Sequence, residues 1–191
     1  MNKSILIAIR LFLILTVITG IIYPLLITGI SGIFFYDKAE GNLVKINGEV
    51  VGSKLIGQQF DSAFYFHSRP SAINYQTLPS GASNLSWSDN RLKVAVNLRK
   101  EAFLRENLLA DTTTVPTEML FASASGIDPH ISPASAYLQM ERIALSRNFN
   151  DEQRLKLGQL ITELKEEPQY SLFGKERINV FLLNLELDKI K

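Results

Sequence analysis

Two polar segments of the chain contain most of the side chains that could do chemistry or bind a partner. The first lies between residues 52 and 72, the second lies between residues 125 and 133, and each contains one histidine. Proline restricts the backbone, so Asp128-Pro129 and Ser132-Pro133 predict a rigid turn that leads into a helix. We interpret these segments either as a loop network that satisfies its own polar groups or as a preformed surface for docking a partner.

The same segments offer one enzymatic alternative, a membrane-anchored serine hydrolase in which His130 would activate Ser125. The chain has no Gly-x-Ser-x-Gly nucleophile motif, no Gly-x-x-x-x-Gly-Lys-Ser/Thr phosphate loop and no cysteine. His67 and His130 are far apart and lack the i, i+4 spacing that would place both on one helix face. We therefore expect no catalytic residue, no metal site and no firmly bound cofactor, and the hydrolase ranks last.

The net charge of the chain gives no indication of nucleic-acid binding. Its 191 residues include 20 Lys plus Arg and 19 Asp plus Glu, which gives a net charge of +1. A nucleic-acid-binding domain needs a clustered basic excess. The charges are unevenly distributed, because residues 1–36 contain only Lys3 and Arg10. This asymmetry indicates that two parts of the chain are adapted to different solvents.

Residues 1–36 are predicted to form a transmembrane anchor whose span is about residues 11–35. That span contains no charged residue. A helix of this length extends roughly 37 Å, which is enough to cross a hydrocarbon core of about 30 Å with some tilt. A cleaved signal peptide is the alternative, but its apolar region usually has only about 7–15 residues. No clear small-residue cleavage site follows the apolar run, so the anchor is the preferred interpretation.

Small or helix-perturbing residues occupy every fourth position of the span: Thr16, Gly20, Pro24, Thr28 and Gly32. Positions four apart lie near one another on a helix, and small side chains let a second membrane helix approach closely. We therefore expect this stripe to pack against a membrane partner. Pro24 removes a backbone donor, which predicts a kink near mid-span. Lys3 and Arg10 favour a cytoplasmic N-terminus, but lysines on the other side make the charge bias too weak to decide the orientation.

Residues 37–191 are predicted to form one mixed α+β domain. Asn47-Gly48 lies between two β-prone runs and is a strong hairpin signal, because both turn residues need a positive φ. Residues 55–60 are expected to form a further short strand. Residues 62–90 are rich in serine but also contain several aromatic side chains, so we expect a long, ordered loop.

Three helices and one strand are expected in the rest of this domain. Ser88 or Asp89 can cap a helix that runs to about Leu109. Ser132-Pro133 predicts the start of a second helix, and Asn150-Asp151-Glu152-Gln153 predicts the start of a third. Residues 177–187 are apolar on both faces and are predicted to form an interior strand. The expected fold class is therefore α+β, with one N-terminal transmembrane helix.

The order of motifs along the chain resembles the KdpC family, the C subunits of the bacterial Kdp potassium-transporting P-type ATPase. The resemblance covers nearly the whole length, and several motifs in order are more specific than any one of them. The matching stretches are the anchor, Gly52 through Phe60, Tyr65 through Ala72, Ser80 through Leu85, Gly126 through Pro133, Gln139 to Arg142, Arg147, and Arg177 through Asp188.

This resemblance implies a non-catalytic subunit of a membrane complex that takes up potassium with high affinity. Its partners would be a channel-like potassium-binding subunit, the ATP-hydrolysing P-type subunit and a small single-helix subunit. The N-terminus would be cytoplasmic, and the C-terminal domain would be extracytoplasmic and would stabilise the complex. Family members have been described as catalytic chaperones that raise the ATP affinity of the ATP-hydrolysing subunit. Direct ATP binding by this chain is the alternative.

Motif matches and polarity together select six candidate interface residues: Gln58, His67, Arg69, Asn84, Asp128 and His130. Two positions depart from the family pattern, because Ala82 and Ala124 stand where the family usually has glycine. Alanine tolerates a positive φ poorly. These two changes therefore weaken the comparison of the serine- and glycine-rich stretches with a nucleotide-binding signature.

Overall fold

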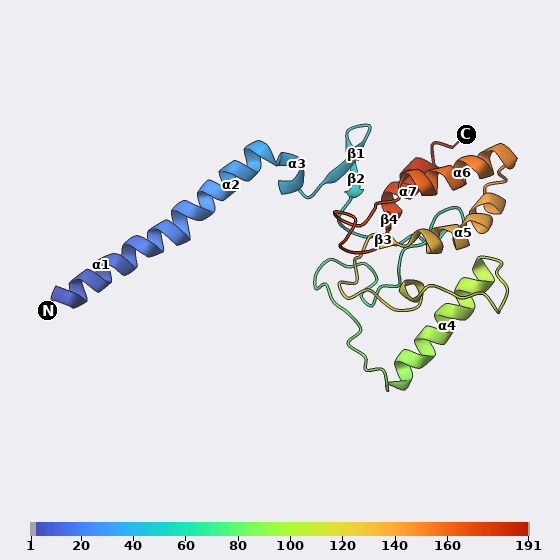
Figure 1. Ribbon diagram of the computed structural model, residues 1–191, viewed down its shortest axis with the longest axis horizontal. Helices are drawn as coiled ribbons and strands as arrows, with labels where there is room; N and C mark the ends of the chain where they lie inside the picture. Colours follow the sequence, from blue (N-terminus) through green and yellow to red (C-terminus); the bar gives the residue numbers. More distant parts are fainter. Residues whose placement is uncertain (1–2, 191) are drawn as a thin grey trace. The chain divides into compact units, whose positions relative to one another are not determined.

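The computed structural model describes residues 3–190 and divides the chain into two compact units, Met1–Val51 and Gly52–Lys191 (Figure 1). The outermost residues of the predicted segments 1–36 and 37–191, which are residues 1–2 and 191, lie outside the described residues. The structure mixes helices and short strands after one apolar N-terminal helix. The predicted α+β class with a single candidate membrane helix is confirmed.

The first unit begins with a long apolar helix. Its segments are α1 (Lys3–Val17), a π-helical turn (Ile18–Ile22) and α2 (Tyr23–Phe34). Together they form a helix of 32 residues that contains an 18-residue window with a mean hydropathy of 2.7, and no residue of that window is buried within the chain. By length and composition this helix can cross a membrane.

At Pro24, where the sequence predicts a kink, the backbone hydrogen bonding changes directly before the proline. The N–H of Tyr23 donates to the carbonyl of Ile18, five residues back, which is the pattern of a π-helix. Pro24 then lies in the first turn of α2, where proline is tolerated. The π turn therefore accommodates Pro24 within a continuous helix.

The predicted hairpin at Asn47-Gly48 is confirmed. After the short helix α3 (Tyr36–Ala39), strands β1 (Leu43–Ile46) and β2 (Glu49–Ser53) form a two-stranded sheet. Asn47 has a φ of 53° and Gly48 has a φ of 89°, as a turn with two left-handed residues requires.

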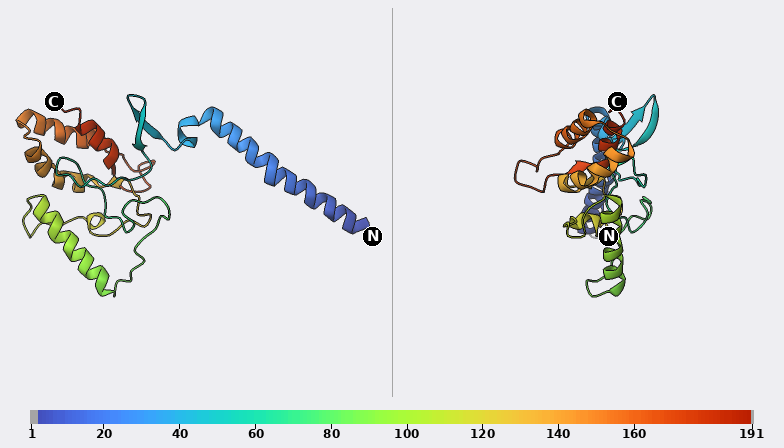
Figure 2. Two further views of the ribbon diagram at one scale, coloured as in Figure 1. Left: turned by 180° about the vertical axis from the view of Figure 1, so that it is seen from behind. Right: turned by 90° about the vertical axis from the view of Figure 1, so that its right-hand side faces the viewer.

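The second unit contains four helices and one two-stranded sheet among the residues that the structure describes. Its elements are α4 (Asn90–Glu106), a 3-10 turn (Thr117–Met119), β3 (His130–Ile131), α5 (Pro133–Ser146), α6 (Asp151–Glu163), β4 (Ile178–Asn179) and α7 (Val180–Leu187). Strands β3 and β4 pair antiparallel, with His130 opposite Asn179. Figure 2 shows α5, α6 and α7 grouped together, while α4 extends from the opposite side of this unit.

The predicted helix starts are confirmed by their caps. The carboxylate of Asp89 caps α4, and the hydroxyl of Ser132 caps α5. Asn150 and Gln153 form a reciprocal capping box at the start of α6. These caps satisfy backbone donors that a helix terminus leaves free.

The predicted strand at residues 55–60 is wrong. This segment has no strand, and the N–H of Gly57 donates to the carbonyl of Ile127 at 2.7 Å within a loop. The backbones are so close that a Cβ at Gly57 would lie 2.6 Å from the carbonyl oxygen of Asp128. This segment is therefore held by a close contact between two loops and not by the hydrogen-bond ladder of a β-sheet.

The predicted interior strand at residues 177–187 is also wrong beyond its first residues. Only Ile178–Asn179 is strand, and Val180–Leu187 is helix α7. Asn179 caps this helix by accepting from the N–H of Leu182 at 3.1 Å. A run that is apolar on every face suits a buried helix as well as a buried strand. The cap provided by Asn179 favours the helix.

The hydrophobic core lies between α4, α5, α6 and α7 of the second unit. Phe66 contributes a fully buried ring from the long loop before α4. The fully buried core side chains are Phe66, Ala136, Ile143, Ala144, Leu157, Ile161, Ile178, Val180, Leu183 and Leu187. This core fixes the loops that carry the candidate site.

Candidate functional site

Three of the predicted interface residues form one cluster. Arg69 Nη1 donates to Asp128 Oδ2 at 2.7 Å, and the backbone N–H of His130 donates to Asp128 Oδ1 at 3.0 Å. The ring nitrogen Nδ1 of His130 lies 3.4 Å from Asp128 Oδ1. The two polar segments recognised in the sequence therefore meet at the carboxylate of Asp128.

The electrostatics of this cluster favour the ionised carboxylate. Burial alone would raise the pKa of Asp128, but hydrogen bonds from His130 and the charge of Arg69 lower it to about 2. Arg69 Nε is buried and has no hydrogen-bond partner among the described residues. Arg69 thus depends on Asp128 as its charged partner, and the cluster is a stable ion pair at neutral pH.

Backbone contacts from β4 and α7 hold the Asp128 loop in position. The N–H of Val180 donates to the carbonyl of Pro129 at 2.9 Å. The side-chain amide of Asn179 donates to the carbonyl of Lys54 at 2.7 Å. Together with the contact between Gly57 and Ile127, these bonds join both polar segments to the end of β4.

His67 does not belong to this cluster. Its backbone N–H donates to Gln139 Oε1 at 2.7 Å, and its ring Nε2 lies 3.1 Å from the carbonyl oxygen of Ser62. Its Nδ1 lies 3.8 Å from Glu106 Oε2. Burial and the nearby charge of Arg142 lower the pKa of His67, so the neutral ring is favoured at pH 7.

A buried arginine organises the region around His67. Arg142, on α5, donates to Asn107 Oδ1 at 2.9 Å, to the Ala63 carbonyl at 2.7 Å and to Gln139 Oε1 at 2.9 Å. Burial lowers the pKa of Arg142 to about 10, so the side chain remains charged at neutral pH. The site prediction omitted Arg142 and Gln139, although both lie in a stretch that matched the family pattern.

Two further polar side chains hold the backbone of the first polar segment. Asn184 accepts from the N–H of Phe66 at 2.8 Å and donates to the Phe66 carbonyl at 3.0 Å. Arg147 donates to the Phe64 carbonyl at 2.8 Å and to Asp188 at 2.7 Å. Asn184 and Arg147 therefore hold the first polar segment against the helices of the core. Asn184 could have been predicted as a structural residue, because it is a polar residue within an otherwise apolar run.

The other two predicted interface residues, Gln58 and Asn84, both lie in loops of the second unit. The carbonyl of Gln58 accepts from the hydroxyl of Ser68 at 2.9 Å. Asn84 is exposed in the loop before α4 and has a φ of 52°. Ser125 Oγ accepts from the N–H of Ile127 at 3.2 Å, and the ring nitrogen Nδ1 of His130 lies next to Asp128.

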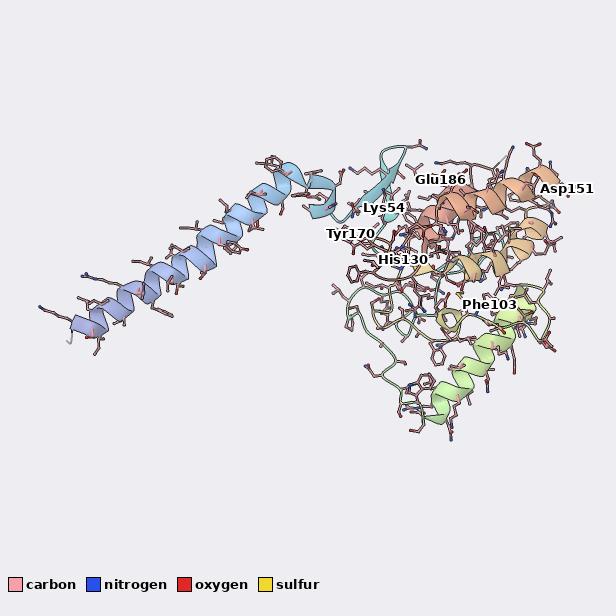
Figure 3. All side chains as sticks on the ribbon, viewed as in Figure 1. Lys54, Phe103, His130, Asp151, Tyr170 and Glu186 are labelled. Atoms are coloured by element: carbon pink, nitrogen blue, oxygen red, sulfur yellow. The ribbon has the colours of Figure 1, made fainter. Side chains whose placement is uncertain are left out.

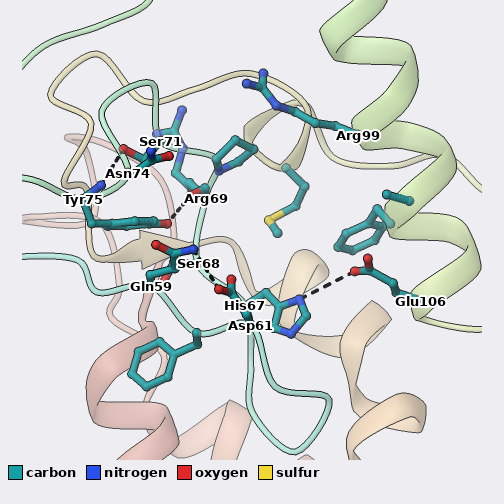
Figure 4. Close-up of a pocket in the computed structure, with 15 residues that line it drawn as sticks. Gln59, Asp61, His67, Ser68, Arg69, Ser71, Asn74, Tyr75, Arg99 and Glu106 are labelled. Carbon is teal, nitrogen blue, oxygen red and sulfur yellow. Dashed lines mark hydrogen bonds and ion pairs between the residues drawn. The ribbon is translucent and has the colours of Figure 1, made fainter.

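A cavity of about 310 Å³ lies between the first polar segment and α4 (Figure 4). Arg99 and Glu106 line it from α4, while His67, Arg69 and Tyr75 line it from the loop. The hydroxyl of Tyr75 donates to the Arg69 carbonyl, and burial raises the pKa of Tyr75 to about 12. Among residues 3–190, no three His, Asp or Glu side chains converge to form a metal site.

Comparison with known proteins identifies the family of this chain. The family model described as KdpC, the c chain of the K+-transporting ATPase, matches residues 5–189. The chain belongs to the KdpC family. The KdpC subunit of the potassium-transporting ATPase of Leptospira interrogans is 47% identical over 182 residues, which cover 95% of this chain and 92% of that protein. The KdpC subunit of Mycobacterium tuberculosis is 41% identical over 192 residues and is matched over its full length.

A third KdpC relative, from Koribacter versatilis, is 40% identical over 190 residues, or 98% of this chain. The resemblance inferred from the motifs is therefore confirmed. Two positions of this KdpC chain that depart from the expected glycine pattern, Ala82 and Ala124, are absent from the residues with positive φ. Gly126, by contrast, has a φ of 73°, a backbone conformation that favours glycine.

Proposed function

We propose that this chain is a non-catalytic subunit of a potassium-transporting ATPase and is needed to assemble and stabilise that complex. The observation that supports this proposal is the KdpC match over residues 5–189, which includes both the apolar helix and the folded unit. The polar cluster of Arg69, Asp128 and His130 satisfies its own charges. Such a cluster suits a rigid docking surface better than a reaction centre.

The apolar helix supplies the first proposed contact with the complex. A Cβ at Gly20 or Gly32 would meet nothing within 4 Å, so the small-residue stripe is open to a neighbouring helix. Membrane helices associate through such small residues because lipid offers no hydrophobic driving force between them. We propose that Thr16, Gly20, Pro24, Thr28 and Gly32 pack against the channel-like potassium-binding subunit.

The second unit supplies the other contact. We propose a cytoplasmic N-terminus and an extracytoplasmic domain that lies against the same channel-like subunit, with the ATP-hydrolysing and small single-helix subunits completing the complex. In this arrangement a catalytic-chaperone effect on ATP affinity is transmitted through the subunit contacts. ATP then binds the ATP-hydrolysing subunit, and this chain needs no nucleotide site of its own.

Affinity purification of the tagged full chain tests this function. Cells starved of potassium are solubilised in mild detergent, and the eluate is identified by mass spectrometry and assayed for potassium-stimulated ATPase activity. Recovery of a P-type ATPase and a channel-like subunit is expected. Gly20→Leu with Gly32→Leu should reduce that recovery, because larger side chains prevent close helix approach. Recovery of the chain alone would contradict the proposal.

The orientation has its own test. Protease added outside spheroplasts should cleave the folded domain if that domain is extracytoplasmic. Protection of the domain until the membrane is disrupted would place it in the cytoplasm. That result would favour direct ATP binding by this chain, the alternative function.

A further inference from the structure

The segment between α6 and β4 forms a protruding hairpin-like loop. At its base, the N–H of Glu166 donates to the Arg177 carbonyl at 2.8 Å, and the reverse bond is 3.1 Å. Nearer the tip, Gln169 and Phe173 exchange two backbone hydrogen bonds, each of 2.9 Å. The right-hand view of Figure 2 shows this loop extending away from the helices of its unit.

The tip of this loop, residues 169–174, presents three large side chains to solvent. Tyr170 is 82% exposed, Leu172 is 80% exposed and Phe173 is 67% exposed. Figure 3 shows Tyr170 at the periphery of the Gly52–Lys191 unit. The tip contains no charged residue. Scattered exposed apolar residues are normal, but three at one tip mark an interaction surface.

The tip is also held in one conformation before any partner binds. Tyr170 and Ser171 both have left-handed φ angles, of 55° and 57°. The N–H of Ser171 donates to the Pro168 carbonyl at 2.9 Å. Residues other than glycine occupy this region at a cost and do so where the surrounding structure requires it. A preorganised loop loses less entropy when it binds than a flexible one.

Charges at the base of the loop neutralise one another. Lys165 Nζ lies 2.7 Å from Glu167 and 2.8 Å from Glu176, and Arg177 Nε lies 2.8 Å from Glu166 Oε2. Insertion into an anionic membrane surface is favoured by a flanking excess of Lys and Arg. This loop has no such excess, so its chemistry favours an uncharged apolar groove on a protein.

We propose that residues 169–174 form a docking loop that inserts Tyr170, Leu172 and Phe173 into an apolar groove of another protein subunit of the complex. This inference rests on the proposed function, since it requires that complex. The aromatic side chains of Tyr170 and Phe173 can bury about 150–250 Å² each, so these two side chains cover roughly half of a standard interface of about 800 Å² per partner. The docking loop is thus an anchor within a larger contact.

Photocrosslinking of the full chain within the detergent-solubilised complex tests the docking loop. Leu172 is replaced by the photoreactive residue benzoylphenylalanine, and Leu155, which is 69% exposed on α6, receives the same replacement as a control. We expect a crosslink to a protein subunit from position 172 and none from position 155. Crosslinks only to lipid, only to a second copy of the chain, or equally from both positions would overturn the inference.

A second variant measures how much the docking loop contributes. Tyr170→Ser, Leu172→Ser and Phe173→Ser together remove the apolar tip but leave its backbone bonds, and Leu155→Ser is the matched control. Recovery of the partner subunits should fall about tenfold with the triple variant, as expected for anchor residues of an interface. If the triple variant recovers the partner subunits as fully as the wild type, the docking-loop proposal alone is wrong. If the wild-type chain itself recovers no partner subunits, both the proposed function and the docking-loop proposal are wrong.

Discussion

Replacement of Asp128 by asparagine tests the ion pair at the centre of the candidate site. Asp128→Asn keeps the shape of the side chain and an oxygen that can accept from the N–H of His130. It removes the negative charge that Arg69 contacts at 2.7 Å. Arg69 Nε already has no hydrogen-bond partner among the described residues, so the variant leaves a partly buried guanidinium without its counter-charge.

The lowered pKa of Asp128 gives the expected magnitude. The pKa falls from 3.8 to about 2, because the interactions of His130 and Arg69 outweigh the effect of burial. At about 1.4 kcal/mol per pH unit, this stabilises the folded chain by about 2 kcal/mol. Because the folded pKa lies below the unfolded one, the contribution is complete above about pH 5 and is lost as the pH falls through 3.8 toward 2.

Urea unfolding of the full chain in neutral detergent, followed by circular dichroism, measures this contribution. Asp128→Asn should be less stable than the wild type by about 2 kcal/mol at pH 7, and the difference should shrink toward zero near pH 2. Asp89→Asn is the matched control, since it removes a carboxylate whose partner at 2.7 Å, Arg91, is exposed, but keeps a good helix cap. Equal stability of Asp128→Asn and the wild type at pH 7, or a difference that does not change with pH, would refute the reasoning.

Three further substitutions test the packing around the site. Gly57→Ala should lower the free energy of unfolding by about 1–3 kcal/mol, because its Cβ would lie 2.6 Å from the Asp128 carbonyl oxygen; an unchanged melting temperature would contradict this close contact. Gly158→Ala should stabilise α6 by about 0.5–1 kcal/mol, since its Cβ meets only the Met140 sulfur at 3.9 Å. A lower melting temperature for this variant than for the wild type would contradict the prediction. Arg142→Met should cost about 3 kcal/mol or more in urea unfolding, because it removes the donor of three oxygen acceptors. A loss under about 1 kcal/mol would show that those acceptors find other partners.

Elements that depend on local chemistry were predictable from the sequence. The Asn47-Gly48 turn, the Ser132 cap and the Asn150 capping box each involve side chains and backbone within three residues of one another. No distant contact is needed to select these structures. The hairpin and the starts of α5 and α6 therefore lie where the sequence indicates.

Residues 177–187 show where local pattern fails. An apolar run of this kind is typical of an interior strand and is equally typical of a buried helix. The structure has Val180, Leu183 and Leu187 fully buried on one helix, a spacing of three and four residues. Asn179 as a cap before an apolar run was the local signal that distinguishes the two.

The candidate site was predictable in part for a similar reason. The sequence placed Arg69, Asp128 and His130 in the two polar segments, and the structure brings these three residues together. His67 instead contacts Gln139, Ser62 and Glu106, and these contacts depend on the path of the long loop, which has no local signature. Arg142, likewise, is positioned by contacts with residues distant in the sequence.

Potassium uptake by cells tests the central claim most directly. A strain that lacks the gene for this chain is grown at micromolar potassium, and uptake is measured with and without the wild-type chain supplied from a plasmid. If the chain is a required subunit of a potassium-transporting ATPase, high-affinity uptake is lost in the deletion strain and restored by the chain. High-affinity uptake that continues unchanged in the deletion strain would contradict that role.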